Sequence, residues 1–311
     1  MALTAAVMLA AVACGGADAG SGGGGDKLAG TIKVDGSSTV APLSTAAAQL
    51  FQQENPGVKV TVGTSGTGGG FEKFCAGETD VSDASRPIKD EEKAICARNG
   101  IKYEEFQVAN DGLSVVVSKD NDFAECLTVE QLRKIWEPGS KVDNWNQVDP
   151  AFPDVELELF GAGTDSGTFD YFTQAINGEE GKSRTDYSPS EDDNVTVQGV
   201  SGSKGGMGYF GLSYYEENKD KLKVLKIDGG GGCVEPTQTT VQDGTYKPLS
   251  RPLFIYPNAA ALDRKEVEAF VEYYVEHNAD IAKAAQFVPL NSQQEAELEK
   301  DLETLRKRHA P

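Results

Sequence analysis

Short strand patterns alternate with helical patterns from Thr31 onward, and this order constrains the fold more than any other feature of the sequence. The segment 31–36 predicts a strand, 42–57 predicts a helix that begins near Pro42, and 59–66 predicts a second strand. A further helix is expected around 70–77. Strands that alternate with helices at this spacing are typical of a parallel or mixed sheet in the α/β class.

Two apolar runs punctuate the rest of the chain. The run 113–118 predicts a strand that is buried on both faces, and 251–257 is a second apolar run bracketed by prolines. Two predicted helices, 263–278 and 291–309, close the chain. With 311 residues the chain is about twice the usual size of a domain, which favours two domains over one.

The charge balance narrows the classes of partner. The formal net charge is -20 at pH 7, and a field of that sign repels nucleic acid at long range, so no nucleic-acid partner is expected. The two histidines, His277 and His309, are few for zinc chemistry, and the sequence has no CxxC motif. We therefore expect neither a metal nor another cofactor.

The first thirteen residues are apolar and lead to Cys14, which a Gly- and Ser-rich stretch follows. Because a run this short cannot span a bilayer, it predicts the apolar region of an export signal. The small residues before Cys14 resemble a bacterial lipoprotein cleavage site, so residues 1–27 are the expected signal and flexible tether, with Cys14 lipidated. A disordered N-terminus with a chance cysteine is the alternative.

Four cysteines remain after Cys14, and in an exported protein an even number suggests disulfides. Four cysteines allow three pairings. They are Cys75, Cys96, Cys126 and Cys233.

Three segments share one design, in which a strand pattern ends in Gly, Ser or Thr residues and a helix pattern begins. They are Gly36–Val40, Ser65–Gly70 and Thr164–Thr168. Helix N-termini expose unpaired N–H groups, and nearby hydroxyls add donors, so each segment can bind a small anion. Each segment alone is also an ordinary helix cap. Three of them at corresponding places predict convergence on one anionic ligand.

A fourth segment, 80–87, places Asp83 near Arg86 in a predicted loop. A guanidinium can bind an oxyanion through two parallel hydrogen bonds. The alternative is an exposed local ion pair between Asp83 and Arg86.

Seven ordered segments resemble the PstS-like family, the phosphate-binding lipoproteins of bacterial high-affinity phosphate ABC transporters. They are DGSSTVAPLS, GTSGTGGGF, DVSDASRPI, DGLSVVVS, IWEPGSKVDNWNQV, GTDSGTFDYF and GGMGYFGLSYY. The resemblance covers about residues 30–291. It implies an α/β periplasmic-binding-protein fold of type II, in which two lobes joined by crossover strands close over one dehydrated phosphate.

Carried over motif by motif, the resemblance implies phosphate contacts from both lobes. The expected ligand residues are Ser38, Thr39, Ser65, Thr67 and Asp83 in the first lobe, and Ser166, Gly167 and Thr168 in the second. Better-known members of the family place an arginine just before the second-lobe loop, where this chain has Phe160–Gly163 without a basic residue. Arg86 is the expected substitute. An ionised Asp83 can only accept hydrogen bonds, so it should favour protonated phosphate over sulfate.

The resemblance also predicts the lobe boundaries, because such proteins cross between lobes on extended strands. We expect lobe one to comprise 28–115 plus 253–311, and lobe two 116–252. The cysteines then pair within lobes, Cys75 with Cys96 and Cys126 with Cys233.

The implied function is that of an extracytoplasmic, lipid-anchored and monomeric receptor, which captures inorganic phosphate and hands it to an ABC transporter permease without catalysis. One alternative is a receptor of the same fold for sulfate, molybdate or another oxyanion. Another is an enzyme such as a phosphatase or serine hydrolase, although the sequence offers no metal-ligand cluster or base positioned for a nucleophile. A third is a surface adhesin that retains the fold.

Overall fold

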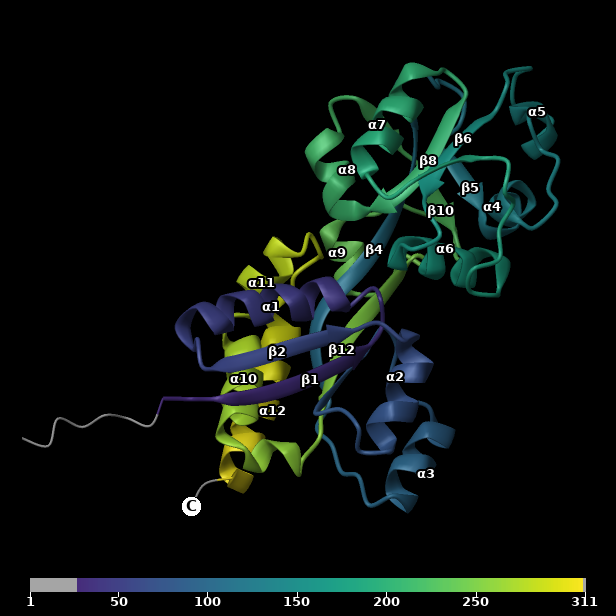
Figure 1. Cartoon of the computed structure of the whole chain (residues 1–311). Helices are drawn as coiled ribbons and strands as arrows, with labels where there is room; N and C mark the ends of the chain where they lie inside the picture. Colours follow the sequence, from purple (N-terminus) through teal and green to yellow (C-terminus); the bar gives the residue numbers. More distant parts are fainter. Residues whose placement is uncertain (1–26, 310–311) are drawn as a thin grey trace, which may run out of the picture.

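The computed structural model describes residues 27–309, and a long mixed sheet runs through them (Figure 1). In order across the sheet, the strands are β2 (Val58–Gly63), β1 (Gly30–Gly36), β3 (Val81–Ala84), β12 (Ser250–Pro257), β4 (Phe106–Ser118), β8 (Gly206–Gly211), β6 (Glu158–Ala162) and β7 (Ser188–Ser190). β9 (Leu222–Val224) also pairs with β4. β1 runs parallel to β2 and β3, whereas β12 runs antiparallel to β3 and β4, so the predicted α/β class with a mixed sheet is confirmed.

A smaller sheet combines β11 (Cys233–Val234), β10 (Lys226–Asp228) and β5 (Cys126–Thr128). The disulfide between Cys126 and Cys233 joins its two outer strands, and the disulfide between Cys75 and Cys96 joins the helices that follow β2 and β3. These are the two pairings that the sequence analysis expects.

Helices surround both ends of the long sheet (Figure 1). Around the end that carries β1 to β3 lie α1 (Ala41–Glu54), α2 (Gly66–Cys75), α3 (Asp90–Arg98), the 3₁₀ turn η1 (Ala261–Asp263), α10 (Lys265–Glu276), α11 (Asn278–Ala284) and α12 (Ser292–His309). Around the other end lie α4 (Val129–Trp136), α5 (Trp145–Val148), α6 (Gly167–Asn177), α7 (Asp193–Gly202), α8 (Leu212–Asn218) and α9 (Gln238–Gln242). Among the described residues, no helix combines the length and apolar character that crossing a bilayer requires.

The apolar residues gather into two large cores at opposite ends of the sheet. The first core contains Ile32 of β1, Phe51 of α1 and Phe270 of α10. The second core contains Trp136 and Trp145. Side chains spaced by whole helical turns bury one face of α1 in the first core, which explains why this alanine-rich segment forms a helix there.

β4 and β12 are the strands that pass between the two cores (Figure 1). Phe106 and Val108 of β4 pack in the first core, whereas Leu113 and Val115 pack in the second. β4 begins at Phe106, well before the apolar run at 113 that predicts it. Its first half contains polar residues that hydropathy does not mark as a strand, and Asn110 is nevertheless buried because Gln294 and the carbonyl of Pro289 satisfy its amide.

Candidate functional site

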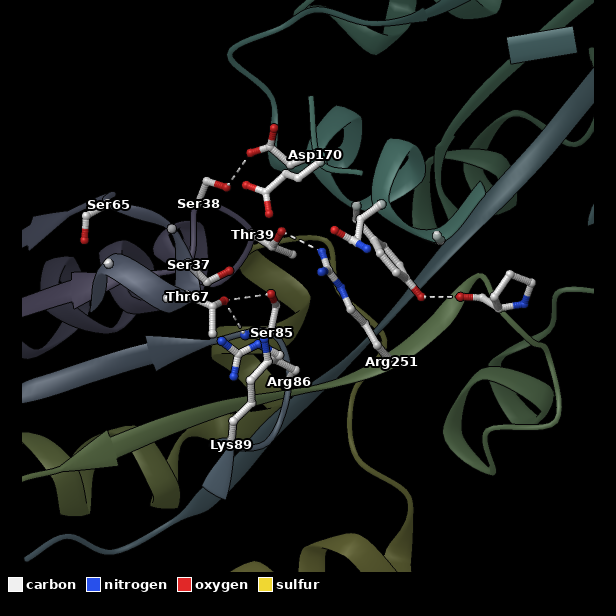
Figure 2. Close-up of a pocket in the computed structure, with 18 of the residues that line it drawn as sticks. Ser37, Ser38, Thr39, Ser65, Thr67, Ser85, Arg86, Lys89, Asp170 and Arg251 are labelled. Atoms are coloured by element: carbon white, nitrogen blue, oxygen red, sulfur yellow. Dashed lines mark hydrogen bonds between the residues drawn. The ribbon is translucent and has the colours of Figure 1, made fainter. Parts of the chain in front are cut away.

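A polar pocket of about 740 Å³ lies between the two ends of the sheet, where the start of α1 meets the start of α6 (Figure 2). The residues that line it are Ser37, Ser38, Thr39, Ser65, Gly66, Thr67, Gly68, Gly69, Ser85, Arg86, Lys89, Asp170, Tyr171, Gln174, Ala175, Glu180, Pro248, Ser250 and Arg251. Five of the residues that the sequence analysis expects as ligands are among them. These are Ser38, Thr39, Ser65, Thr67 and Arg86.

The turn that leads from β1 into α1 forms the centre of the pocket. The Ser37 N–H donates to the carbonyl oxygen of Asp83 at 2.9 Å, which ties this turn to β3. The next two residues, Ser38 and Thr39, precede the helix start at Ala41, and Thr39 is 7% exposed. Unpaired N–H groups and hydroxyl donors therefore come together at the positive end of α1.

The start of α6 lies against the start of α1, although the two are far apart in the sequence. The Thr39 hydroxyl donates to the carbonyl oxygen of Gly167 at 3.3 Å, and the Ser38 hydroxyl donates to Asp170 Oδ2 at 3.2 Å. A Cβ atom at Gly167 would lie 2.8 Å from both the nitrogen and Oγ1 of Thr39, so only glycine allows this approach. The Thr168 N–H donates to the Ser166 hydroxyl at 3.1 Å, which caps the helix. The expected second-lobe loop is thus in contact with the first through Gly167 and Thr39, but Ser166, Gly167 and Thr168 are not among the residues that line the pocket.

The glycine-rich segment after β2 forms the first turns of α2 instead of a loop. The Ser65 hydroxyl donates to Asp35. Burial raises the pKa of Asp35, but the hydrogen bonds from Lys73 and Ser65 outweigh that effect, so the pKa lies below its usual value. Figure 2 shows Ser65 apart from the other labelled hydroxyls, whereas Thr67 faces Ser85, with 3.0 Å between the two hydroxyl oxygens. Of the two expected ligand residues in this segment, Thr67 therefore lies nearer the centre of the pocket than Ser65 does.

Asp83 lies behind the lining of the pocket and is completely buried. Ser44 of α1 donates to its Oδ1 at 2.8 Å, while Oδ2 has no hydrogen-bond partner among the described residues. Burial raises the pKa of the Asp83 carboxyl to about 8, opposed by the Ser44 hydroxyl and reinforced by the negative charge of Asp35. In the ligand-free protein this carboxyl therefore carries a proton at neutral pH. The alternative of a local ion pair between Asp83 and Arg86 is wrong, because Arg86 pairs with Glu92 at 2.7 Å.

Arg251 lines the pocket and has no counterpart in the sequence analysis, which noted its segment only as an apolar run. Arg251 Nη2 donates to Thr39 Oγ1 at 2.7 Å (Figure 2), and Nε donates to Asp111 Oδ2 at 3.2 Å. The basic residue at the start of that run was the available signal. Spacing could not show that it lies beside Thr39.

Asp170 and Glu180 line the pocket with carboxyl groups, and Asp111 pairs with the lining residue Arg251. Burial raises the pKa of Asp170, although the Ser38 hydroxyl and the charge of Arg251 lower it in part. Burial likewise raises the pKa of Asp111 against the opposing effect of Arg251. The site therefore combines hydroxyl and N–H donors with guanidinium and carboxyl groups, a set that can both donate to and accept from an oxyanion that carries a proton.

Comparison with known proteins places the chain among solute-binding proteins. The PBP superfamily domain matches residues 21–278. The phosphate-binding protein PstS of Staphylococcus saprophyticus is 43% identical over 295 residues, which cover 94% of this chain and 90% of that protein. Protein SphX of Synechococcus elongatus is 48% identical over 262 residues, covering 83% of this chain and 77% of that protein. The crystal structure of a possible phosphate-binding protein from Planctomyces limnophilus is 49% identical and superposes with a TM-score of 0.86, covering 89% of this chain and 99% of that one.

Proposed function

Because the chain belongs to the PBP superfamily and, within it, to the family of PstS phosphate-binding proteins, we propose that it captures inorganic phosphate in the pocket between its two lobes. The observation that carries this proposal is the meeting of the α1 and α6 helix starts at Thr39 and Gly167. Two helix N-termini that point at one place, with hydroxyls beside them, form a binding site for a small oxyanion.

We propose that the phosphate oxygens accept hydrogen bonds from the turn before α1 and from the start of α6. Thr39 and Thr67 line the pocket with hydroxyls, and the capped turn Ser166–Thr168 borders it. A bond from Thr39 to phosphate would replace the one that its hydroxyl donates to the carbonyl oxygen of Gly167. Closure of the lobes would bring these donors onto one ligand.

Asp83 is proposed as the acceptor for the proton of phosphate, a role that requires its carboxyl to release, when the ligand binds, the proton that it holds at neutral pH. Its Oδ2 is buried without a hydrogen-bond partner among the described residues, and such an atom is costly unless a ligand or water satisfies it. Ser37, whose N–H bonds the Asp83 carbonyl, lines the pocket, so the side chain lies one layer behind the site.

The two cores support the proposed lobes, 28–115 plus 253–311 and 116–252. Ile32 and Phe270 pack in the first core, and Trp136 packs in the second. Closure would then move the cores relative to each other about β4 and β12.

We further propose that the protein passes phosphate, chemically unchanged, to an ABC transporter permease on the outer side of the cytoplasmic membrane. The relative from Staphylococcus saprophyticus is a phosphate-binding protein, and a receptor of this kind needs a permease to complete transport. Lipidation at Cys14, which lies outside the described residues, would hold the monomeric receptor near that partner.

Calorimetric titration of the ligand-stripped protein with phosphate, sulfate and molybdate tests the proposal. We expect phosphate to bind most tightly. Tighter binding of sulfate or molybdate would assign the pocket to another oxyanion, and absence of binding to all three would favour an adhesin. Steady release of phosphate from a phosphate monoester would instead indicate an enzyme.

A further inference from the structure

The pocket contains two arginine side chains whose nitrogen atoms are used differently. Arg86 directs both terminal nitrogens at Glu92, at 2.8 and 2.7 Å, and its Nη1 also donates to the carbonyl oxygen of Pro87 at 3.1 Å. A carboxylate therefore fills the fork that an oxyanion would use. A ligand would have to displace Glu92 before Arg86 could bind it through two bonds.

Arg251 is held from the sides, so that the end of its guanidinium faces the pocket. Nε bonds Asp111 at 3.2 Å, and the guanidinium carbon lies 3.5 Å from the centre of the Tyr171 ring. Nη2 donates to Thr39 Oγ1 at 2.7 Å, and Nη1 makes no hydrogen bond to the described residues. Figure 2 shows the side chain extending toward Thr39, where the two helix starts meet.

We propose that Arg251 is the arginine that binds the phosphate, and that Asp111 and Tyr171 hold its guanidinium in the binding position. The inference rests on the proposed function. The Arg251 side chain is 17% exposed, compared with 30% for Arg86, so its charge is less screened by water. A guanidinium beside a hydroxyl that itself faces the anion can add a charge-assisted bond without rearrangement of its own partners.

Arg251 on β12 contacts residues from both sides of the pocket, so a ligand that binds Arg251 can act on both lobes. Thr39 lies on the first side of the pocket, whereas Tyr171 belongs to α6 on the second side and donates its hydroxyl to the carbonyl of Pro248 at 2.8 Å. Because Arg251 stacks on Tyr171 of the second side, an anion that bonds both Thr39 and Arg251 would hold the two sides of the pocket together. Phosphate would therefore stabilise the closed state through this one side chain.

The experiment is calorimetric titration of phosphate into ligand-stripped wild-type protein and matched variants. Arg251→Gln should bind phosphate at least about 30-fold more weakly, since truncation of one member of a buried charged pair has large effects. Arg251→Lys keeps the charge but not the fork, and we expect about tenfold weaker binding. Arg86→Gln should weaken phosphate binding less than Arg251→Gln does. Lys59→Gln, at an exposed position on β2, controls for the change in net charge.

A further variant separates ligand binding from folding, because Arg251→Gln leaves the buried Asp111 without its cation. The double variant Asp111→Asn/Arg251→Gln contains no unpaired charge at this place and should fold, as judged by its thermal melt, yet bind as weakly as Arg251→Gln. The inference is overturned, while the proposed function stands, if the double variant binds phosphate with an affinity within threefold of wild type. The same holds if Arg86→Gln weakens phosphate binding more than Arg251→Gln does. If wild-type protein binds no phosphate, both fail.

Discussion

Raising the pH from 5 to 7 should destabilise the ligand-free protein through Asp83, and the change Asp83→Asn should remove that part of the pH dependence. Asp83 is completely buried with a pKa of about 8, whereas an aspartate in an unfolded chain has a pKa of about 3.9. Between these two values the native state holds a proton that the unfolded chain releases. The free energy of unfolding therefore falls as the pH rises through this window.

The magnitude follows from the difference between the two pKa values. Each pH unit inside the window costs about 1.4 kcal/mol, so the full span amounts to roughly 6 kcal/mol and the step from pH 5 to pH 7 to about 3 kcal/mol. Asparagine keeps an oxygen that can accept from Ser44 but does not titrate. The difference in unfolding free energy between variant and wild type should therefore shift in favour of the variant by about 3 kcal/mol over that step.

Urea unfolding at several pH values, in buffer free of phosphate, measures this difference. Other buried carboxyls such as Asp193, with a pKa raised by burial to about 6, titrate in both proteins and cancel in the comparison. Ser44→Ala removes the donor to Asp83 Oδ1, so it should raise the pKa of Asp83 further and extend the slope to higher pH. A difference between Asp83→Asn and wild type that stays constant from pH 5 to pH 8 would refute the reasoning.

Three other predictions follow from single contacts. Gly167→Ala adds a Cβ atom 2.8 Å from the Thr39 nitrogen and should weaken phosphate binding about tenfold by calorimetry, whereas Gly211→Ala, which faces open space, should not; equal effects would contradict the proposed site. Asp83→Asn should narrow the ratio of phosphate to sulfate affinity, mainly by admitting sulfate, and an unchanged ratio would exclude Asp83 from recognition. Removal of the disulfide between Cys126 and Cys233, which are 107 residues apart, should lower the free energy of unfolding by roughly 5 kcal/mol in chemical unfolding. Removal of the disulfide between Cys75 and Cys96, which are 21 residues apart, should lower it by roughly 3 kcal/mol. The reverse order would argue against chain entropy as the cause.

The helix starts of the pocket could be predicted from the sequence because their signals are local. Pro42 lies in the first turn of α1, and Ser166 caps α6 through the N–H of Thr168, two residues further on. Such signals identify where donors are exposed. They do not identify which donors stay unoccupied, and the Ser65 hydroxyl is bound to Asp35, thirty residues earlier in the chain.

The positions of the arginines depend on tertiary contacts that spacing does not encode. Arg86 stands three residues from Asp83, which suggested a pair, but the polypeptide buries Asp83 under α1 and turns Arg86 toward Glu92. Arg251 lies 212 residues from Thr39, and the pairing of β12 with β3 and of β3 with β1 connects the two segments. A hydrophobic pattern can predict that strand but not which side chain at its end enters a pocket.

The protein has a net charge of -20, and the arginines of the pocket are paired with carboxylates, so long-range attraction contributes little to the binding of an anion. Arg86 pairs with Glu92 and Arg251 with Asp111, and the carboxyls of Asp170 and Glu180 offset Lys89, so the pocket has little unbalanced positive charge to attract anions from a distance. Affinity must then come from bonds that form at contact, in a site from which closure removes water. Burial raises the pKa of Asp170, although the hydrogen bond from Ser38 and the charge of Arg251 oppose that shift. The acidic surface and the anion site are therefore compatible, because the first acts over a screened long range and the second over the length of a hydrogen bond.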